Sequence, residues 1–349
     1  MMAGRGLVAW WDLRGRVAHA GWAVMLAVLP LLSACGVKFP ANTFVAHSDL
    51  TKAIQGLYWE VIVWTTAILI LVCALVFAIL VKYSTRPGPD KKPPPEEFES
   101  LALEIAWVAG PALILLLIAI PSIRLVFASQ QVTAPPNALI VEITGHQWWW
   151  EATYPQYGIH TANEFHLPVG RPVRFILTSA DVIHSFWMPQ LGAKRDVVPG
   201  HTNQITFTPS ETGEDFGECA EFCGTSHANM RFRIFVDTKV GFDNWATNMA
   251  SAARPAVGGR VRAGQNIFAT SACTPCHTIK GFSAGTIAPD LTHFATRTTL
   301  AGGTFANTPS NLAKWITNPE AMKPGAQMPA LGLRGPELTD LVAYLESLK

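Results

Sequence analysis

The stretch CAEFCGTSHANM, running from Cys219 to Met230, places two thiols, an imidazole and a thioether close together, and His184 lies upstream of it. Thiolate, imidazole and thioether ligands favour copper, and cuprous copper most of all. A type 1 copper needs one cysteine and two histidines, so this set predicts a pair of copper ions bridged by the two thiolates. Cys219 and Cys223 then form the bridges. Each copper takes one histidine, His184 or His227, and Met230 is a weak axial ligand.

Two other interpretations of these residues remain open at this point. Outside a reducing compartment, Cys219 and Cys223 could form a disulfide, which leaves His227 and Met230 without a role. A Cys₂His₂ zinc site is the second possibility, but such sites do not use methionine and have other spacings.

The region around this motif, 137–240, predicts an all-β domain. Short runs with strand-like composition alternate with Pro and Gly turn signals, as expected for a sandwich or barrel. The clearest runs are Leu139–Thr144, Val173–Thr178, Ile205–Thr208 and Arg231–Val236.

Upstream, the stretches 57–81 and 102–128 are apolar and long enough to cross a bilayer. The chain as a whole is 49% hydrophobic and 15% charged, which supports segments in lipid rather than two buried helices of a soluble protein. The loop 82–101 between them is basic, which predicts that it is cytoplasmic and that the rest of the chain is outside. Its basic residues are Lys82, Arg86, Lys91 and Lys92.

The N-terminus has the features of a lipoprotein signal peptide over residues 1–34. Arginines precede a short apolar run, which ends in Leu32-Ser33-Ala34 just before Cys35. We expect Cys35 to become the lipid-bearing first residue; an ordinary core or membrane cysteine is the alternative.

The stretch Cys273-Thr-Pro-Cys276-His277 is the C-x-x-C-H signature of covalent haem c attachment. A redox-active cysteine pair is the alternative, but it gives no role to His277. The second axial ligand is expected to be a downstream methionine, since Met/His ligation is typical of c-type cytochromes. Met328, followed by proline, is the first choice and Met322 the second.

Helical patterns open and close the segment 260–349, which predicts a separate haem domain. An Ala-, Gly- and Pro-rich linker, 246–259, precedes it. By coil statistics, a linker of this length keeps the haem domain within ~20–25 Å of the β domain.

The copper motif resembles that of cytochrome c oxidase subunit II, of the haem–copper oxidase superfamily. The resemblance covers about 57–237 and implies two transmembrane helices followed by a cupredoxin-like sandwich that holds copper A. Further segments that match the family are Glu104–Trp107, Gly145–Trp150, Asp181–Ser185 and Lys194–Gly200.

The resemblance also assigns roles to single residues. It implies that the carbonyl of Glu221 ligates copper and that its carboxylate helps to hold magnesium at the subunit I interface. Trp148 then accepts electrons, although Trp149 stands where the family usually has Tyr. Glu104 marks the start of a proton path into subunit I.

The haem segment resembles the all-α class I cytochromes c. Gly264, Phe268 and Tyr344 match the helix-crossing positions of that fold. Pro289 is expected to accept a hydrogen bond from the ring of His277, which would tune its basicity.

Together these features predict subunit II of a terminal cytochrome c oxidase, an oxidoreductase and translocase. Neither predicted span contains histidine, so the oxygen chemistry must be on another chain. Expected partners are subunits I and III, the membrane, and a soluble or membrane-bound cytochrome c or another reduced donor. A net charge of +1 gives no reason to expect nucleic acid. The expected location is a bacterial plasma (inner) membrane, with the copper and haem domains on the periplasmic face.

The main alternative is the electron-accepting subunit of a copper A-containing nitric oxide reductase. Nitrous oxide reductase has a similar copper loop but is soluble, and a copper carrier would need an exchangeable metal. Quinol oxidases of this superfamily lack the copper ligands, which are complete here.

Overall fold

The computed structural model describes residues 40–83, 100–130 and 135–349. The chain divides into two compact units, Met1–Asn42 and Thr43–Lys349, and the second holds every element named below. The predicted signal segment, Cys35 and most of the loop 82–101 lie outside the described residues.

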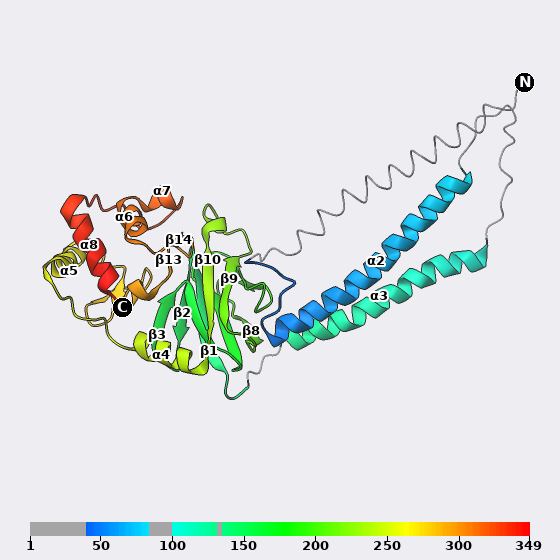
Figure 1. Ribbon diagram of the computed structural model, residues 1–349, viewed down its shortest axis with the longest axis horizontal. Coiled ribbons are helices and arrows are strands. Elements are labelled where there is room, and N and C mark those ends of the chain that lie inside the picture. The colour runs from blue at the N-terminus through cyan, green and yellow to red at the C-terminus, as the bar shows by residue number, and fades with distance from the viewer. Residues whose placement is uncertain (1–39, 84–99, 131–134) are drawn as a thin grey trace, which may run out of the picture. The chain divides into compact units, whose positions relative to one another are not determined.

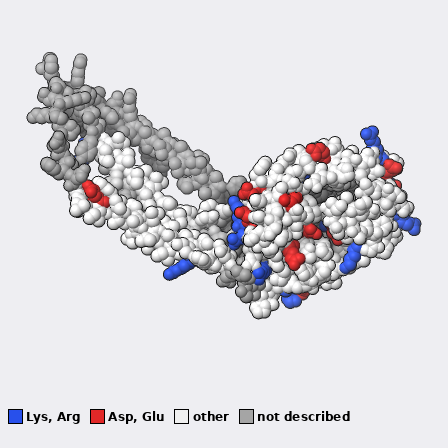
Figure 2. Space-filling view, turned by 180° about the vertical axis from the view of Figure 1, so that it is seen from behind, with Lys and Arg blue, Asp and Glu red and all other residues white. Residues whose placement is uncertain are grey.

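Two long helices, α2 (Asp49–Tyr83) and α3 (Leu101–Ser129), lie side by side (Figure 1). Both are long and apolar enough to cross a membrane. Figure 2 shows few charged side chains along this pair. Both predicted spans lie inside these helices. With 35 residues, α2 measures ~52 Å and is therefore longer than the hydrocarbon layer.

Helix α2 is longer than the hydrocarbon layer because its first turn packs on the β domain. Leu50 is part of the β-domain core. The Asp49 carboxylate accepts the Thr208 backbone N–H at 2.7 Å. The hydroxyl of Ser48 donates to the carbonyl of Leu191 at 2.5 Å. These contacts join the membrane anchor directly to the copper-motif domain.

The β domain is a sandwich of two five-stranded sheets, with strand orders β3-β2-β1-β5-β8 and β4-β10-β9-β6-β7. All four strands expected from the sequence are present, as β1, β5, β8 and β10. The pairs β1–β5 and β4–β10 are parallel and the others antiparallel. In chain order the strands are β1 (Leu139–His146), β2 (Trp149–Tyr154), β3 (Ile159–Ala162), β4 (Glu164–Pro168), β5 (Val173–Ser179), β6 (His184–Trp187), β7 (Arg195–Val197), β8 (Asn203–Phe207), β9 (Gly213–Cys219) and β10 (Arg231–Asp237).

Helix α4 (Lys239–Ala250) follows the sandwich and packs against it. The expected linker 246–259 is therefore wrong at its start, because residues 246–250 are helical. Phe242, Ala246 and Met249 are buried at helical spacing and join the β-domain core. Trp245 packs edge-on against Tyr154, with ring centroids 5.1 Å apart. Only 251–258 then connect α4 to the next helix.

The C-terminal domain is helical, with α5 (Gly259–Thr270) crossing α8 (Gly335–Ser347). At the crossing, a Cβ on Gly264 would lie 1.9 Å from the backbone oxygen of Asp340, so the helices meet as closely as the missing side chain allows. Phe268 and Tyr344 are buried beside it, with ring centroids 5.8 Å apart. The remaining elements of this domain are the 3₁₀ helix η3 (Phe294–Thr296), α6 (Pro309–Thr317), α7 (Pro319–Met322) and the two-stranded ladders β11 (Thr278–Ile279) with β12 (Ser283–Ala284) and β13 (Thr299–Leu300) with β14 (Phe305–Ala306).

Candidate copper and haem sites

The copper motif lies at one end of the second sheet, where β6 and β9 bring two distant ligands together. These strands pair antiparallel with Phe186 opposite Cys219. His184 is two residues from Phe186, so it lies on the same face of the sheet as Cys219. The short 3₁₀ helix η2 (His227–Asn229) then returns the chain to the same place.

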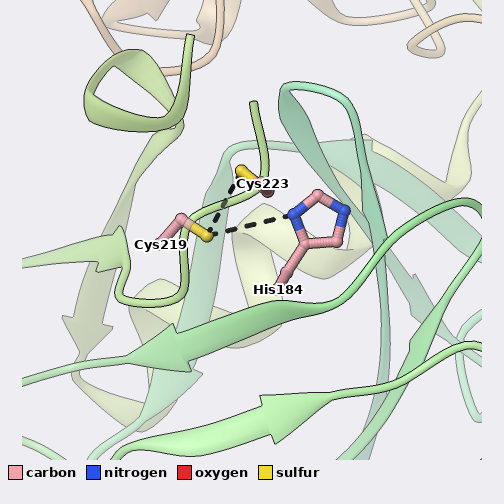
Figure 3. Close-up of side chains that lie close together, drawn as sticks. All are labelled: His184, Cys219 and Cys223. Atoms are coloured by element: carbon pink, nitrogen blue, oxygen red, sulfur yellow. Dashed lines mark hydrogen bonds between the residues drawn. The ribbon is translucent and has the colours of Figure 1, made fainter. Parts of the chain in front are cut away.

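The two cysteine sulfurs lie 3.7 Å apart, and Cys219 also faces His184 (Figure 3). The Sγ of Cys219 is 3.9 Å from the Nδ1 of His184. The Sγ of Cys223 is 3.6 Å from the Nδ1 of His227 and 3.8 Å from the Sδ of Met230. Ligands of one metal at about 2.0–2.3 Å are separated by such distances.

Both thiols are free, so the disulfide interpretation is wrong for this structure. His184, Cys219 and Cys223 are all buried and form a group able to hold a metal ion. The carbonyl oxygen of Glu221 lies 3.3 Å from the Sγ of Cys219, while its side chain is exposed. The geometry therefore favours copper over zinc, because the ligand set is soft and includes a thioether, which zinc sites do not use.

The two neighbouring thiols shift each other's pKa in opposite directions. A hydrogen bond from Cys223 lowers the pKa of Cys219 to about 3, although burial opposes this. The neighbouring Cys219 thiolate, together with burial, raises the pKa of Cys223. The contact therefore favours the thiolate form of Cys219, the form that binds metal.

Asp181 orients His184 and had no role in the sequence analysis, although its segment matched the family. Its Oδ1 lies 2.8 Å from the Nε2 of His184, and its Oδ2 accepts the Gln147 backbone N–H at 2.6 Å. Burial raises the pKa of Asp181, but these hydrogen bonds and that from Val182 lower it more, so it stays ionised. Such a carboxylate fixes the ring orientation of a ligating histidine.

The three consecutive tryptophans have different environments. Trp150 is fully buried in the core, and Trp149 stacks on His146 with ring centroids 4.2 Å apart. Trp148 reaches the copper loop, because its indole N–H donates to the carbonyl of Cys223 at 3.0 Å. Trp148 is therefore the tryptophan of this segment that is hydrogen-bonded to the copper loop.

The C-x-x-C-H residues of the C-terminal domain line a largely apolar cavity. His277 lines it beside Cys273 and Cys276. The Nδ1 of His277 is 2.8 Å from the carbonyl of Pro289, which confirms that expected contact. Burial lowers the pKa of His277, which keeps the imidazole neutral as a ligand must be.

Of the two methionines, Met328 lines this cavity and Met322 is not among its lining residues. Arg297 also lines the cavity and is partly buried. Its Nη2 donates to the carbonyl of Asp290 at 2.5 Å, its Nε has no hydrogen-bond partner among the described residues, and burial lowers its pKa. A guanidinium with an unused N–H beside an apolar cavity fits a large ring carrying carboxylates, as haem does. The cavity therefore suits haem. Sequence reasoning missed Arg297, because a lone arginine carries no motif.

Side chains of the β domain also line this cavity, among them Trp148 and Asn163. Lys323, which is 4% exposed, lies at the same place, and its Nζ donates to the carbonyls of Trp148 at 2.5 Å and Ala301 at 3.0 Å. Burial lowers the pKa of Lys323 to about 7, although Cys223 raises it. The haem cavity thus adjoins the copper loop.

Three family descriptions match consecutive parts of the chain. "Cytochrome C oxidase subunit II, transmembrane domain" matches 25–125, "Cytochrome C oxidase subunit II, periplasmic domain" matches 158–238, and "Cytochrome c" matches 261–349.

Two curated relatives match this chain over most of their length. Cytochrome c oxidase subunit 2 of Alkalihalophilus pseudofirmus is 36% identical over 80% of this chain and 82% of its own. That of Bacillus subtilis is 32% identical over 95% of this chain and 99% of its own. The solved periplasmic domain of subunit II of cytochrome oxidase (CoxB) of Bradyrhizobium japonicum is 32% identical over 34% of this chain and 96% of its own, with a TM-score of 0.32.

Two candidate membrane helices, a cupredoxin-like domain with a thiolate metal group and a helical c-type cytochrome domain define a membrane-anchored electron-transfer subunit of a haem–copper oxidase complex. The chain belongs to the cytochrome c oxidase subunit 2 family. It is thus part of an oxidoreductase, with a copper A domain on the outer side of the membrane.

Proposed function

We propose that this chain takes electrons from cytochrome c or another reduced donor at haem c, and passes them through copper A to subunit I. Subunit I would reduce O₂ to water with proton pumping. When bound, haem c and copper A each supply a one-electron redox centre. Neither α2 nor α3 contains a histidine that could hold a haem in the membrane, which supports oxygen chemistry on another chain.

The proposed ligands come from the geometry above and from the family resemblance. Cys273 and Cys276 attach the haem, and His277 and Met328 ligate its iron. Copper A, a pair of copper ions, is held by His184, Cys219, the carbonyl of Glu221, Cys223, His227 and Met230.

Trp148 carries this proposal, because it contacts both sites at once. Its indole N–H donates to the carbonyl of Cys223, and the residue also lines the haem cavity. A covalent and hydrogen-bonded route therefore connects the haem cavity to a bridging cysteine. This contact supports the order donor, haem c, copper A.

Stopped-flow mixing of the assembled oxidase with a reduced donor tests the order. We expect the haem c absorbance to change before the copper band. Met328→Ala should slow copper reduction by lowering the haem potential, whereas Met322→Ala is the matched control and should not. Copper reduction ahead of the haem in the wild-type chain would overturn the order.

Further roles are proposed on the family resemblance. Glu104 lies in the first turn of α3 and would take up protons from the cytoplasmic side. The exposed carboxylate of Glu221 would help to hold magnesium at the subunit I interface. Subunit III is a further proposed partner and a bacterial inner membrane the proposed location, with Cys35 as the lipid attachment site. The comparisons do not favour the nitric oxide reductase alternative.

A further inference from the structure

The haem domain contacts the copper domain through two loops, 298–304 and 323–325, and much of this contact uses backbone groups. The Arg231 backbone N–H donates to the carbonyl of Gly302 at 2.9 Å. The Ser226 hydroxyl donates to the carbonyl of Pro324 at 2.5 Å. These partners flank η2, which carries His227, so the haem domain contacts the loop of copper ligands itself.

Glu164, from the copper domain, is the first of two buried side chains that cross this interface. The residue is 5% exposed, and its carboxylate accepts four hydrogen bonds from the haem-domain loop. Thr298 donates through its backbone N–H at 3.0 Å and its hydroxyl at 2.9 Å. Thr299 donates in the same two ways, at 2.7 Å and 2.5 Å. A buried carboxylate is stable only with such donors.

The backbone at Glu164 is itself held rigidly. Glu164 lies opposite Arg233 in the β4–β10 ladder. The preceding residue, Asn163, exchanges two hydrogen bonds with Trp150, at 2.9 Å between backbones and 2.8 Å through its side chain. The carboxylate thus holds a loop whose neighbouring residue, Arg297, lines the haem cavity.

Lys323, from the haem domain, is the reciprocal element. Its Nζ donates to the carbonyl of Trp148 in the copper domain and to that of Ala301 in the haem-domain loop. It therefore ties together the loop held by Glu164 and the tryptophan that contacts the copper loop. At Gly325 a Cβ would lie 2.6 Å from the Trp148 ring, and φ is +83°, so backbone and indole meet there without a side chain between them.

We propose that Glu164 and Lys323 are positioning residues that hold the haem domain in one orientation on the copper domain, as a fixed relay rather than a tethered shuttle. The relay role rests on the proposed function, whereas the fixed docking rests on the contacts alone. Water can rehydrate both groups when the domains separate, so their contribution is to orientation more than to raw affinity. Because the contacts are buried, docking should depend little on ionic strength.

Hydrogen–deuterium exchange of the full-length chain in the assembled oxidase tests the proposal without relying on turnover. Glu164→Ala should speed exchange about tenfold in both facing segments, 298–304 and 226–231, as expected when charge-assisted hydrogen bonds are lost. Lys323→Met should do the same. The matched control is Glu142→Ala, since Glu142 is an exposed glutamate on β1.

Two further readouts separate positioning from a general structural role. The copper and haem absorption spectra of both variants should match the wild type, while electron transfer from haem to copper slows. If Glu164→Ala does not fold, Thr299→Val removes one donor and leaves the carboxylate, and it should show a smaller rise in exchange in the same segments.

Unchanged exchange in both facing segments, or equal effects in the Glu142→Ala control, would overturn the proposal. The order of electron flow is a separate outcome. If the exchange results hold but copper is reduced before haem c in the wild type, the fixed docking stands and the proposed order fails.

Discussion

Replacing Gly264 with alanine should destabilise the haem domain, although alanine is the better helix former. In the middle of a helix, Gly→Ala is favourable by about 1 kcal/mol. Here, however, the new Cβ would lie 1.9 Å from the oxygen and 2.6 Å from the carbon of the Asp340 carbonyl, and 2.7 Å from the Cβ of Tyr344. Two of these three contacts are backbone atoms, which cannot rotate away, so α5 and α8 must separate.

Overpacking of this kind costs about 3 kcal/mol, the upper end of the usual range, because the clash is with backbone. The net loss is then about 2 kcal/mol. For a domain of this size, each 1 kcal/mol shifts the midpoint of thermal unfolding by about 4–8 °C, so the expected fall is about 8–16 °C. The assay is thermal unfolding followed by haem c absorbance.

Gly259→Ala is the matched control in the same helix. A Cβ at Gly259 meets nothing within 4 Å. This substitution should raise stability by about 0.4–1 kcal/mol, because it restricts the unfolded chain. If Gly264→Ala is as stable as the wild type or more so, the close crossing of α5 and α8 does not determine the stability of the domain.

Three further predictions follow from the sequence motifs. Metal analysis should find about two copper ions per chain with a seven-line mixed-valence resonance, and Cys219→Ser should damage the site more than Met230→Leu because a bridge is lost rather than a weak axial ligand; a single copper would refute it. The intact mass should correspond to a chain that begins at a lipid-bearing Cys35, and a mass that retains 1–34 would contradict this. Glu104→Gln should slow turnover and leave the copper and haem spectra intact; unchanged turnover would mean that Glu104 is an interfacial anchor only.

The copper group was predictable because most of it is local in sequence. Four of its members lie within one short segment from the end of β9 to just before β10: Cys219, Cys223, His227 and Met230. Their soft donor atoms indicate the metal. His184 was assigned less directly, since its approach to Cys219 depends on the register of β6 and β9. No spacing rule in the sequence encodes that register.

The end of helix α4 was missed because the linker-like composition of 246–259 was given more weight than the helical spacing of its apolar residues. The residues 246–259 are rich in Ala, Gly and Pro, which favours a linker. The readable signal lay earlier: Phe242, Ala246 and Met249 are spaced three or four apart, as on one helix face. Extending that pattern would have placed the start of the linker at Ser251.

The docking of the haem domain could not be predicted, for a more general reason. A flexible tether predicts only a local concentration, because coil statistics contain no orientation. The orientation in the structure comes from carbonyls and N–H groups of 298–304 and 323–325, and every residue carries such groups. Glu164 and Lys323 are recognisable as interface residues only once those backbone groups are positioned around them. Fixed docking therefore has almost no sequence signature. The connection 251–258 is shorter than the expected linker, and it suits this docking because the two domains are in contact beside Trp148.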